Sequence, residues 1–166
     1  MDDRLRTELL AVLEEFFERQ DPARAPIARP LIPDRELQMA ASALMVCVVR
    51  ADQASKQDEH RVLEKAIGLT LGVDQATAAR VVRVAEERLV SQASFAEFLK
   101  LLNQGCSDDE KRRILEALWR IAFADAELQG HEEYLVRKVA EHLHLSTADL
   151  VETKVRARET FLAEDI

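Results

Sequence analysis

The feature that most constrains this chain is one pattern written twice: an apolar helix, an acidic turn and a second helix. The stretch "VRADQASKQDEHRVLEKA" (Val49–Ala66) and the stretch "FADAELQGHEEYLVRKV" (Phe123–Val139) share this layout. Each places a Glu at the same distance after an Ala-Asp pair. The helix before each turn is too apolar to face water. We therefore expect an internal repeat in which two central helices pack together.

Periodicity and capping residues predict an all-α chain. Only four glycines and 5% aromatic residues occur in the 166, as is typical of helical proteins. Ser107 and Glu110 form a capping box, Asp74 and Ser146 are further N-caps, and Gly72 suits a helix end. The body, residues 35–166, is thus predicted to contain seven helices, at about 35–50, 56–71, 75–90, 95–104, 108–124, 130–143 and 147–163.

An N-terminal arm precedes this body. Residues 1–20 are predicted as an amphipathic helix with an apolar stripe at helical spacing. The stripe consists of Leu5, Leu9, Leu13, Phe16 and Phe17. Residues 21–34 hold all four prolines and are predicted as an extended linker. The arm has three open roles: docking on the body, exchange between subunits of a homodimer, or contact with a protein partner.

Charge and cysteine content narrow the function classes. The net charge of −8 argues against nucleic acid as a partner, because the phosphate backbone is also negative. The acidic start predicts that there is no signal peptide, and Met39–Val49, the longest apolar run, is too short to cross a membrane. Cys47 and Cys106 lack metal-binding spacing, which predicts a reduced, cytoplasmic protein without membrane insertion.

The duplicated turns offer four carboxylates to a metal ion: Asp52, Glu59, Asp125 and Glu132. Carboxylate oxygens suit calcium or magnesium better than zinc. An EF-hand is excluded, because its twelfth position would be Val136 instead of a bidentate Glu. A structural alternative stays open: Asp can bond turn amides, and Glu at a helix start interacts well with the helix dipole.

Other chemical groups are weaker candidates. His60 and His131 adjoin the two glutamates and could support a metal ligand, although solvated helix residues are the simpler interpretation. His142 and His144 point to different sides of a helix and cannot easily hold one ion. The sequence shows neither a nucleophile–base arrangement nor a phosphate loop, so the chain is predicted not to be an enzyme. A carboxylate-dependent hydrolase is the weakest alternative.

The segments "VVRADQASKQDE" and "IAFADAELQGHEE" resemble the two acidic motifs of the tellurite-resistance TerB-like family. The resemblance covers about 35–159 and implies a compact seven-helix bundle with internal pseudo-twofold symmetry. It also implies a link to bacterial stress response and a metal site at the four acids named above. The family's motif glycine is replaced here by Gln53 and Ala126. Glycine permits a left-handed turn, so these replacements predict a differently shaped turn and a weakened or lost ion site.

From these observations we expect a cytoplasmic, non-enzymatic TerB-like module that binds a divalent cation at its duplicated acidic turns. The alternative is a protein-interaction module in which those turns are structural.

Overall fold

The computed structural model describes residues 3–19, 34–51, 57–88, 92–123 and 130–164. All regular structure within these ranges is helical, as predicted. The helices are α1 (Asp3–Arg19), α2 (Arg35–Ala51), α3 (Gln57–Leu71), α4 (Gln75–Arg88), α5 (Gln92–Gly105), α6 (Asp108–Ala122), α7 (Gly130–His142) and α8 (Thr147–Glu164). The expected all-α architecture, with seven helices after an N-terminal one, is confirmed within the described residues.

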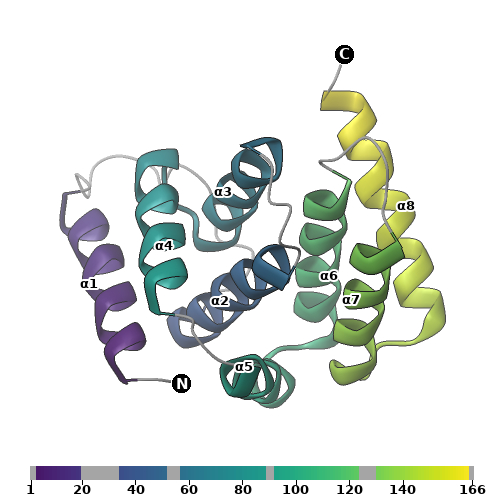
Figure 1. The fold of residues 1–166 in the computed structure, drawn as a ribbon, viewed down its shortest axis with the longest axis horizontal. Coiled ribbons are helices and arrows are strands. Elements are labelled where there is room, and N and C mark those ends of the chain that lie inside the picture. Colours follow the sequence, from purple (N-terminus) through teal and green to yellow (C-terminus); the bar gives the residue numbers. More distant parts are fainter. Residues whose placement is uncertain (1–2, 20–33, 52–56, 89–91, 124–129, 165–166) are drawn as a thin grey trace.

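The helix α2 lies at the centre of the molecule, with α1 and α4 to one side and α6, α7 and α8 to the other (Figure 1). It contacts α3, α4, α5, α6 and α7. Every residue from Gln38 to Val49 is buried except Cys47, which is partly exposed. An apolar helix surrounded in this way gains about 1.5–3 kcal/mol for each large side chain removed from water. The predicted core role of Met39–Val49 is thus confirmed.

The two halves of the body repeat one arrangement approximately. In the first half α2 packs on α3 and α4, and in the second half α6 packs on α7 and α8. Contacts between the halves are also equivalent: α3 packs on α6, and α7 packs on α2. The two central helices, α2 and α6, also touch. The predicted packing of the central helices is therefore observed.

The turn before the third helix of each half has the same backbone form. Gly72 has φ 70° and His144 has φ 56°, both in the left-handed region. In each turn the following residue donates its amide five positions back, to the carbonyl of Gly68 or of Ala140, at 3.0 Å in both cases. This is the hydrogen bond of a Schellman cap. Glycine adopts that conformation freely, whereas histidine adopts it at some cost in free energy.

The N-terminal helix α1 docks on α4 of the same chain. Its buried apolar residues are Leu5, Leu9, Val12, Leu13 and Phe16. The side chain of Phe17 lies outside the described part. Next to this stripe, Arg80 Nη2 of α4 lies 2.9 Å from Glu15 Oε2 of α1. The Arg80 guanidinium holds the pKa of the Glu15 carboxyl below its ordinary value. Of the three roles open to the arm, docking on the body is the one observed here.

None of the described helices is both long enough and apolar enough to cross a membrane. Residues 21–33 of the predicted linker lie outside the described residues.

Candidate functional site

Of the four predicted metal ligands, the structure describes the backbone of the two glutamates and nothing of the two aspartates. Glu59 is the third residue of α3, and Glu132 is the third residue of α7. Asp52 and Asp125 belong to segments outside the described residues, and so do Gln53 and Ala126. The side chains of both glutamates are likewise outside the described part. The structure thus shows the equivalence of the two glutamate positions, and the ligand set itself stays a prediction.

Each helix that carries one of these glutamates packs on the central helix of the opposite half. α3, with Glu59, packs on α6, which leads into the second acidic turn. α7, with Glu132, packs on α2, which leads into the first. Each predicted pair is therefore held by helices that contact the opposite half. This exchange is what an internal twofold repeat produces.

His60, beside Glu59, interacts with carboxylates of its own half. Its Nε2 lies 3.6 Å from Glu64 Oε1, one turn along α3, and its Nδ1 lies 3.7 Å from Glu86 Oε1 on α4. These contacts bridge α3 and α4. Among the described residues, no group of three or more His, Cys, Asp or Glu side chains has the geometry of a metal site. All four predicted ligand side chains lie outside these described residues.

The remaining ligand types named from sequence are placed as follows. His142 and His144 are exposed at the end of α7, and the His142 carbonyl accepts a hydrogen bond from Asn103 Nδ2 of α5. Cys106 lies between α5 and α6. Burial, followed by the nearby Glu110 carboxylate, raises the pKa of its thiol to about 11. A thiol with that pKa is protonated at neutral pH and is a poor nucleophile and metal ligand.

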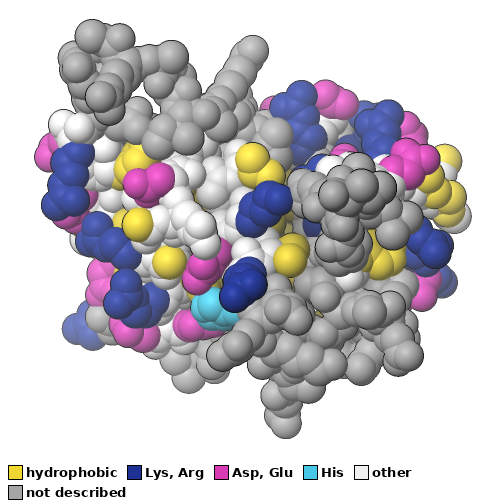
Figure 2. All heavy atoms as spheres, turned by 90° about the horizontal axis from the view of Figure 1, so that it is seen from above, with side chains coloured by type: hydrophobic (Ala, Val, Ile, Leu, Met, Phe, Trp, Pro, Cys, Tyr) yellow, Lys and Arg dark blue, Asp and Glu magenta, His cyan; other side chains and the backbone are white. Residues whose placement is uncertain are grey.

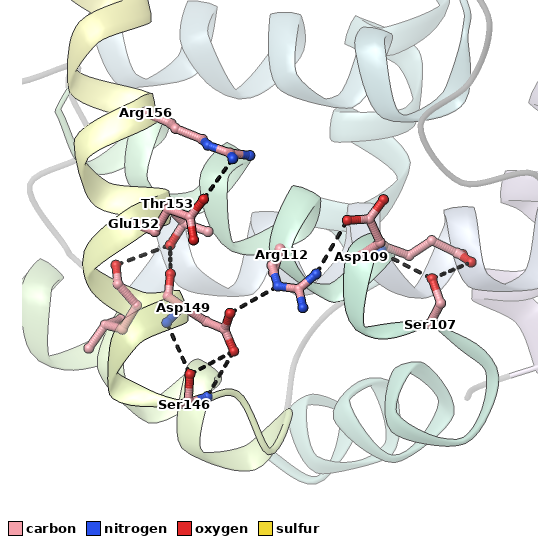
Figure 3. Close-up of polar contacts among 10 residues, drawn as sticks. Ser107, Asp109, Arg112, Ser146, Asp149, Glu152, Thr153 and Arg156 are labelled. Carbon is pink, nitrogen blue, oxygen red and sulfur yellow. Dashed lines mark hydrogen bonds and ion pairs between the residues drawn. The ribbon is translucent and has the colours of Figure 1, made fainter.

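A polar network joins the starts of α6 and α8 (Figure 3). Arg112 of α6 places Nε 2.9 Å from Asp149 Oδ1 of α8 and Nη1 3.3 Å from Asp109 Oδ1. Asp149 also forms a capping box with Ser146, accepting from its amide at 3.1 Å and from its hydroxyl at 2.8 Å. Hydrogen bonds from Ser146, and then from Arg112, hold the pKa of the Asp149 carboxyl below its ordinary value. The network orders α8 on α6 and is structural.

The face seen from above mixes both signs of charge with scattered hydrophobic side chains (Figure 2). Basic and acidic groups alternate over its described part, where no extended patch of a single sign forms. The described part of this face shows no basic stripe of the kind found on nucleic-acid-binding surfaces.

A groove between α3 and α6 is a feature that the sequence analysis missed. It has a volume of about 330 Å³. Its lining residues are Ala66 and Leu69 of α3 and Arg113, Glu116, Ala117 and Arg120 of α6. We call it the α3–α6 groove. The spacing of the four α6 residues along one helix face could have indicated a common surface, but the facing pair on α3 is set by tertiary packing.

Comparison with known proteins gives one match. The family model described as tellurite resistance protein TerB matches residues 38–155. No curated protein and no solved structure matches. The matched region starts within α2 and ends within α8, so it contains both repeats and leaves α1 outside.

Proposed function

The chain belongs to the tellurite resistance protein TerB family, and from this premise we propose that it is a non-enzymatic module that binds a divalent cation at its duplicated acidic turns. The family match supports a tellurite-resistance-related role at the coarser level. We further propose that the module works in the cytoplasm, within a stress-related protein assembly, without binding nucleic acid or inserting into a membrane.

The observation that carries the cation proposal is the duplication itself. Glu59 and Glu132 both occupy the third position of a helix that follows an acidic turn. In each half the preceding Asp, Asp52 or Asp125, stands directly beyond a central helix or close to its end. A pair of related ion sites requires this agreement between the two halves. Oxygen-only ligands favour calcium or magnesium over zinc.

Thermal unfolding of the metal-stripped protein tests this proposal. Calcium, magnesium, manganese and zinc are titrated one at a time. An ion that binds only the folded state stabilises it by about 2.7 kcal/mol at a hundredfold excess over its dissociation constant. We expect calcium or magnesium to raise the melting temperature.

The variant Asp52→Asn/Asp125→Asn should abolish that rise, because an amide lacks the charge that holds the ion. A matched control is Asp108→Asn/Asp109→Asn, which removes two exposed acids at the start of α6. Equal loss in both variants would mean that a general acidic field attracts the ion. An unchanged melting temperature with every ion would reject the cation proposal.

The second candidate function is a protein-interaction module in which the acidic turns are structural. The α3–α6 groove favours it, because an open groove with an apolar floor on a folded domain is a common protein-binding feature. A homodimer formed through the arm is a further proposal. It requires α1 to leave the same-chain contact with α4 or to make that contact with a second copy.

A further inference from the structure

The helix α8 carries apolar side chains on the side that faces solvent. Of the described helices, only α6 packs extensively on α8, which lies at one end of the molecule (Figure 1). Thr153 and Ala157 of α8 are buried. Val151 and Val155 each lie two positions from Thr153, about 200° around the helix, and are 55% and 49% exposed. These two residues, which we call the valine pair, are one turn apart and share the face that points away from the body.

The equivalent positions of α4 are not apolar in this way. When the two left-handed turns are aligned, Ala79 and Arg83 of α4 take the places of the valine pair. Arg83 is exposed, as a charged residue on a helix surface normally is. In α8 the same surface position holds a valine. A helix that is apolar on its outer face as well as towards the core has a second surface suited to packing.

Opposite charges border the valine pair. On a helical wheel, Arg158 lies about 40° from the centre of the pair on one side, and Glu159 lies about 60° from it on the other. Both residues are exposed, and neither side chain forms an ion pair or hydrogen bond with a described residue. The nearby Glu152 and Arg156 pair with each other at 2.6 Å. Arg158 and Glu159 therefore present one positive and one negative group that the described part of the chain leaves unpaired.

This face is complementary to itself in one orientation. If two copies of α8 pack in parallel around a twofold axis that runs along the helices, opposite edges face each other. Arg158 of each copy then lies beside Glu159 of the other copy, at heights that differ by about 1.5 Å. In an antiparallel pair, equal edges would meet, so Arg158 and Lys154 would face the same basic edge of the other copy. Charge thus selects the parallel arrangement, as it does in coiled coils.

We propose that α8 forms a parallel homodimer, in which the valine pairs of two copies pack together and two Arg158–Glu159 ion pairs form across the interface. A second copy is the occupant because it satisfies both unpaired charges at once. The interface is small, so we expect a dissociation constant on the order of 10–100 µM, and a monomer in dilute solution. The proposal does not depend on cation binding and does not involve the N-terminal arm.

Sedimentation equilibrium of the full chain measures this association over a hundredfold concentration range around the expected dissociation constant. Physiological salt screens the repulsion between two chains of net charge −8 beyond about 8 Å. We expect a monomer–dimer equilibrium. Val155→Glu should weaken it by about tenfold or more, because a carboxylate would be buried against its own copy. The matched control is Tyr134→Glu on α7, which alters a side chain that is 55% exposed and should leave the equilibrium unchanged.

A charge exchange tests the ion pairs. Arg158→Glu and Glu159→Arg should each weaken the dimer, because each places two like charges beside each other across the interface. The double variant Arg158→Glu/Glu159→Arg should restore association, since it rebuilds both pairs with the charges reversed. Neither residue has an ion pair within the described part of the chain, so the single variants should fold normally. Circular dichroism verifies this.

Disulfide cross-linking tests the orientation. In a chain that carries Cys47→Ala and Cys106→Ala, a single cysteine is introduced as Val151→Cys or as Val155→Cys. A parallel pair brings each position next to its own copy, so both variants should form disulfide-linked dimers under mild oxidation. An antiparallel pair allows this only at the position that lies on the twofold axis.

A chain that stays monomeric at every concentration would overturn the proposal. So would a dimer that persists in Val155→Glu, or one that Tyr134→Glu weakens equally, because the contact would then lie elsewhere, as in a dimer formed through the arm. Failure of the double charge variant to recover association would reject the ion pairs. Cross-linking at only one of the two valine positions would reject the parallel arrangement.

Discussion

The helices α4 and α8 are the third helices of the two repeats, and they begin alike but present different outer surfaces. Both follow a left-handed residue and both have a capped first turn, at Asp74 and at Ser146. Beyond that turn they diverge. In α4 the buried positions Val81 and Val82 are apolar, and their counterparts in α8 are Thr153 and Lys154.

The divergence follows what lies against each helix. α1 covers α4, and Val81 and Val82 of α4 are buried. In α8, Thr153 satisfies its hydroxyl with the Asp149 carbonyl at 2.8 Å. Lys154 places Nζ 3.2 Å from Glu133 Oε1 and 5.1 Å from the centre of the Trp119 ring. The repeat thus preserves the local turn chemistry, while the surface of each helix differs according to its neighbours.

The largest expected effect tests whether α1 is part of the core. Leu9 of α1 is fully buried, so Leu9→Ala should lower the free energy of unfolding by about 2–5 kcal/mol, measured by urea denaturation. Val151→Ala on α8, where the side chain is 55% exposed, should change it by less than about 0.5 kcal/mol. Equal effects of the two substitutions would show that α1 is not part of the cooperative core.

Equivalent residues of α4 and α8 can be exchanged to test whether each suits its own surroundings. Val81→Thr replaces a methyl with a hydroxyl in an apolar contact and should cost about 1–3 kcal/mol. Thr153→Val should cost less, because the lost hydroxyl bonds only within its own helix. Chemical denaturation of both single variants measures the difference. A larger loss of unfolding free energy in Thr153→Val than in Val81→Thr would contradict this expectation. The hydrogen bonds of the Thr153 hydroxyl would then be important for the stability of the second half.

The left-handed turns test the shared part of the two helices. Gly72→Ala should destabilise the protein by about 1–2 kcal/mol, because a side chain at φ 70° is strained. His144→Gly should be neutral or stabilise by up to about 1 kcal/mol, since glycine removes the same strain from the second turn. Thermal unfolding compares both with wild type. A marked loss of stability in His144→Gly would show that this side chain has a role of its own.

The smallest expected effect concerns pH. The pKa of Asp149 is lowered from its ordinary value of 3.8 by hydrogen bonds from Ser146 and Arg112. The ionised form therefore stabilises the fold: its contribution is complete above the unfolded-state pKa and is lost as the pH falls through the folded-state pKa. Thr77, the counterpart of Asp149 in α4, carries no such charge.

Urea denaturation at a series of pH values measures this effect. Asp149→Asn should lower the free energy of unfolding at pH 7 and show a smaller further loss below about pH 4 than wild type. Glu152→Gln, an exposed residue on the same helix, is the control. Parallel pH profiles for wild type and Asp149→Asn would contradict the assignment.

Much of the fold was predictable because its signals are short-range. Helix starts follow from N-caps. In α6, for example, the Ser107 hydroxyl accepts a hydrogen bond from the Glu110 amide at 3.2 Å. The one clear underestimate was α5, predicted at 95–104 and observed from Gln92. The stretch "SQAS" resembles a turn, but its last three residues belong to the first turn of the helix. Of the candidate site, the sequence located both glutamates at matching helix positions. It missed the α3–α6 groove, whose residues come from two separated helices.

From the amino-acid sequence alone it follows that this protein is helical, that its acidic turn occurs twice, and that α2 is buried. Those properties depend on caps, periodicity and apolar content within a few turns of chain. Three features depend on tertiary packing: α1 covers α4, Arg112 of α6 pairs with Asp149 of α8, and α5 packs on both α2 and α7. Each of these depends on contacts between helices far apart in the chain, where shape and charge select one arrangement among several that local chemistry allows equally.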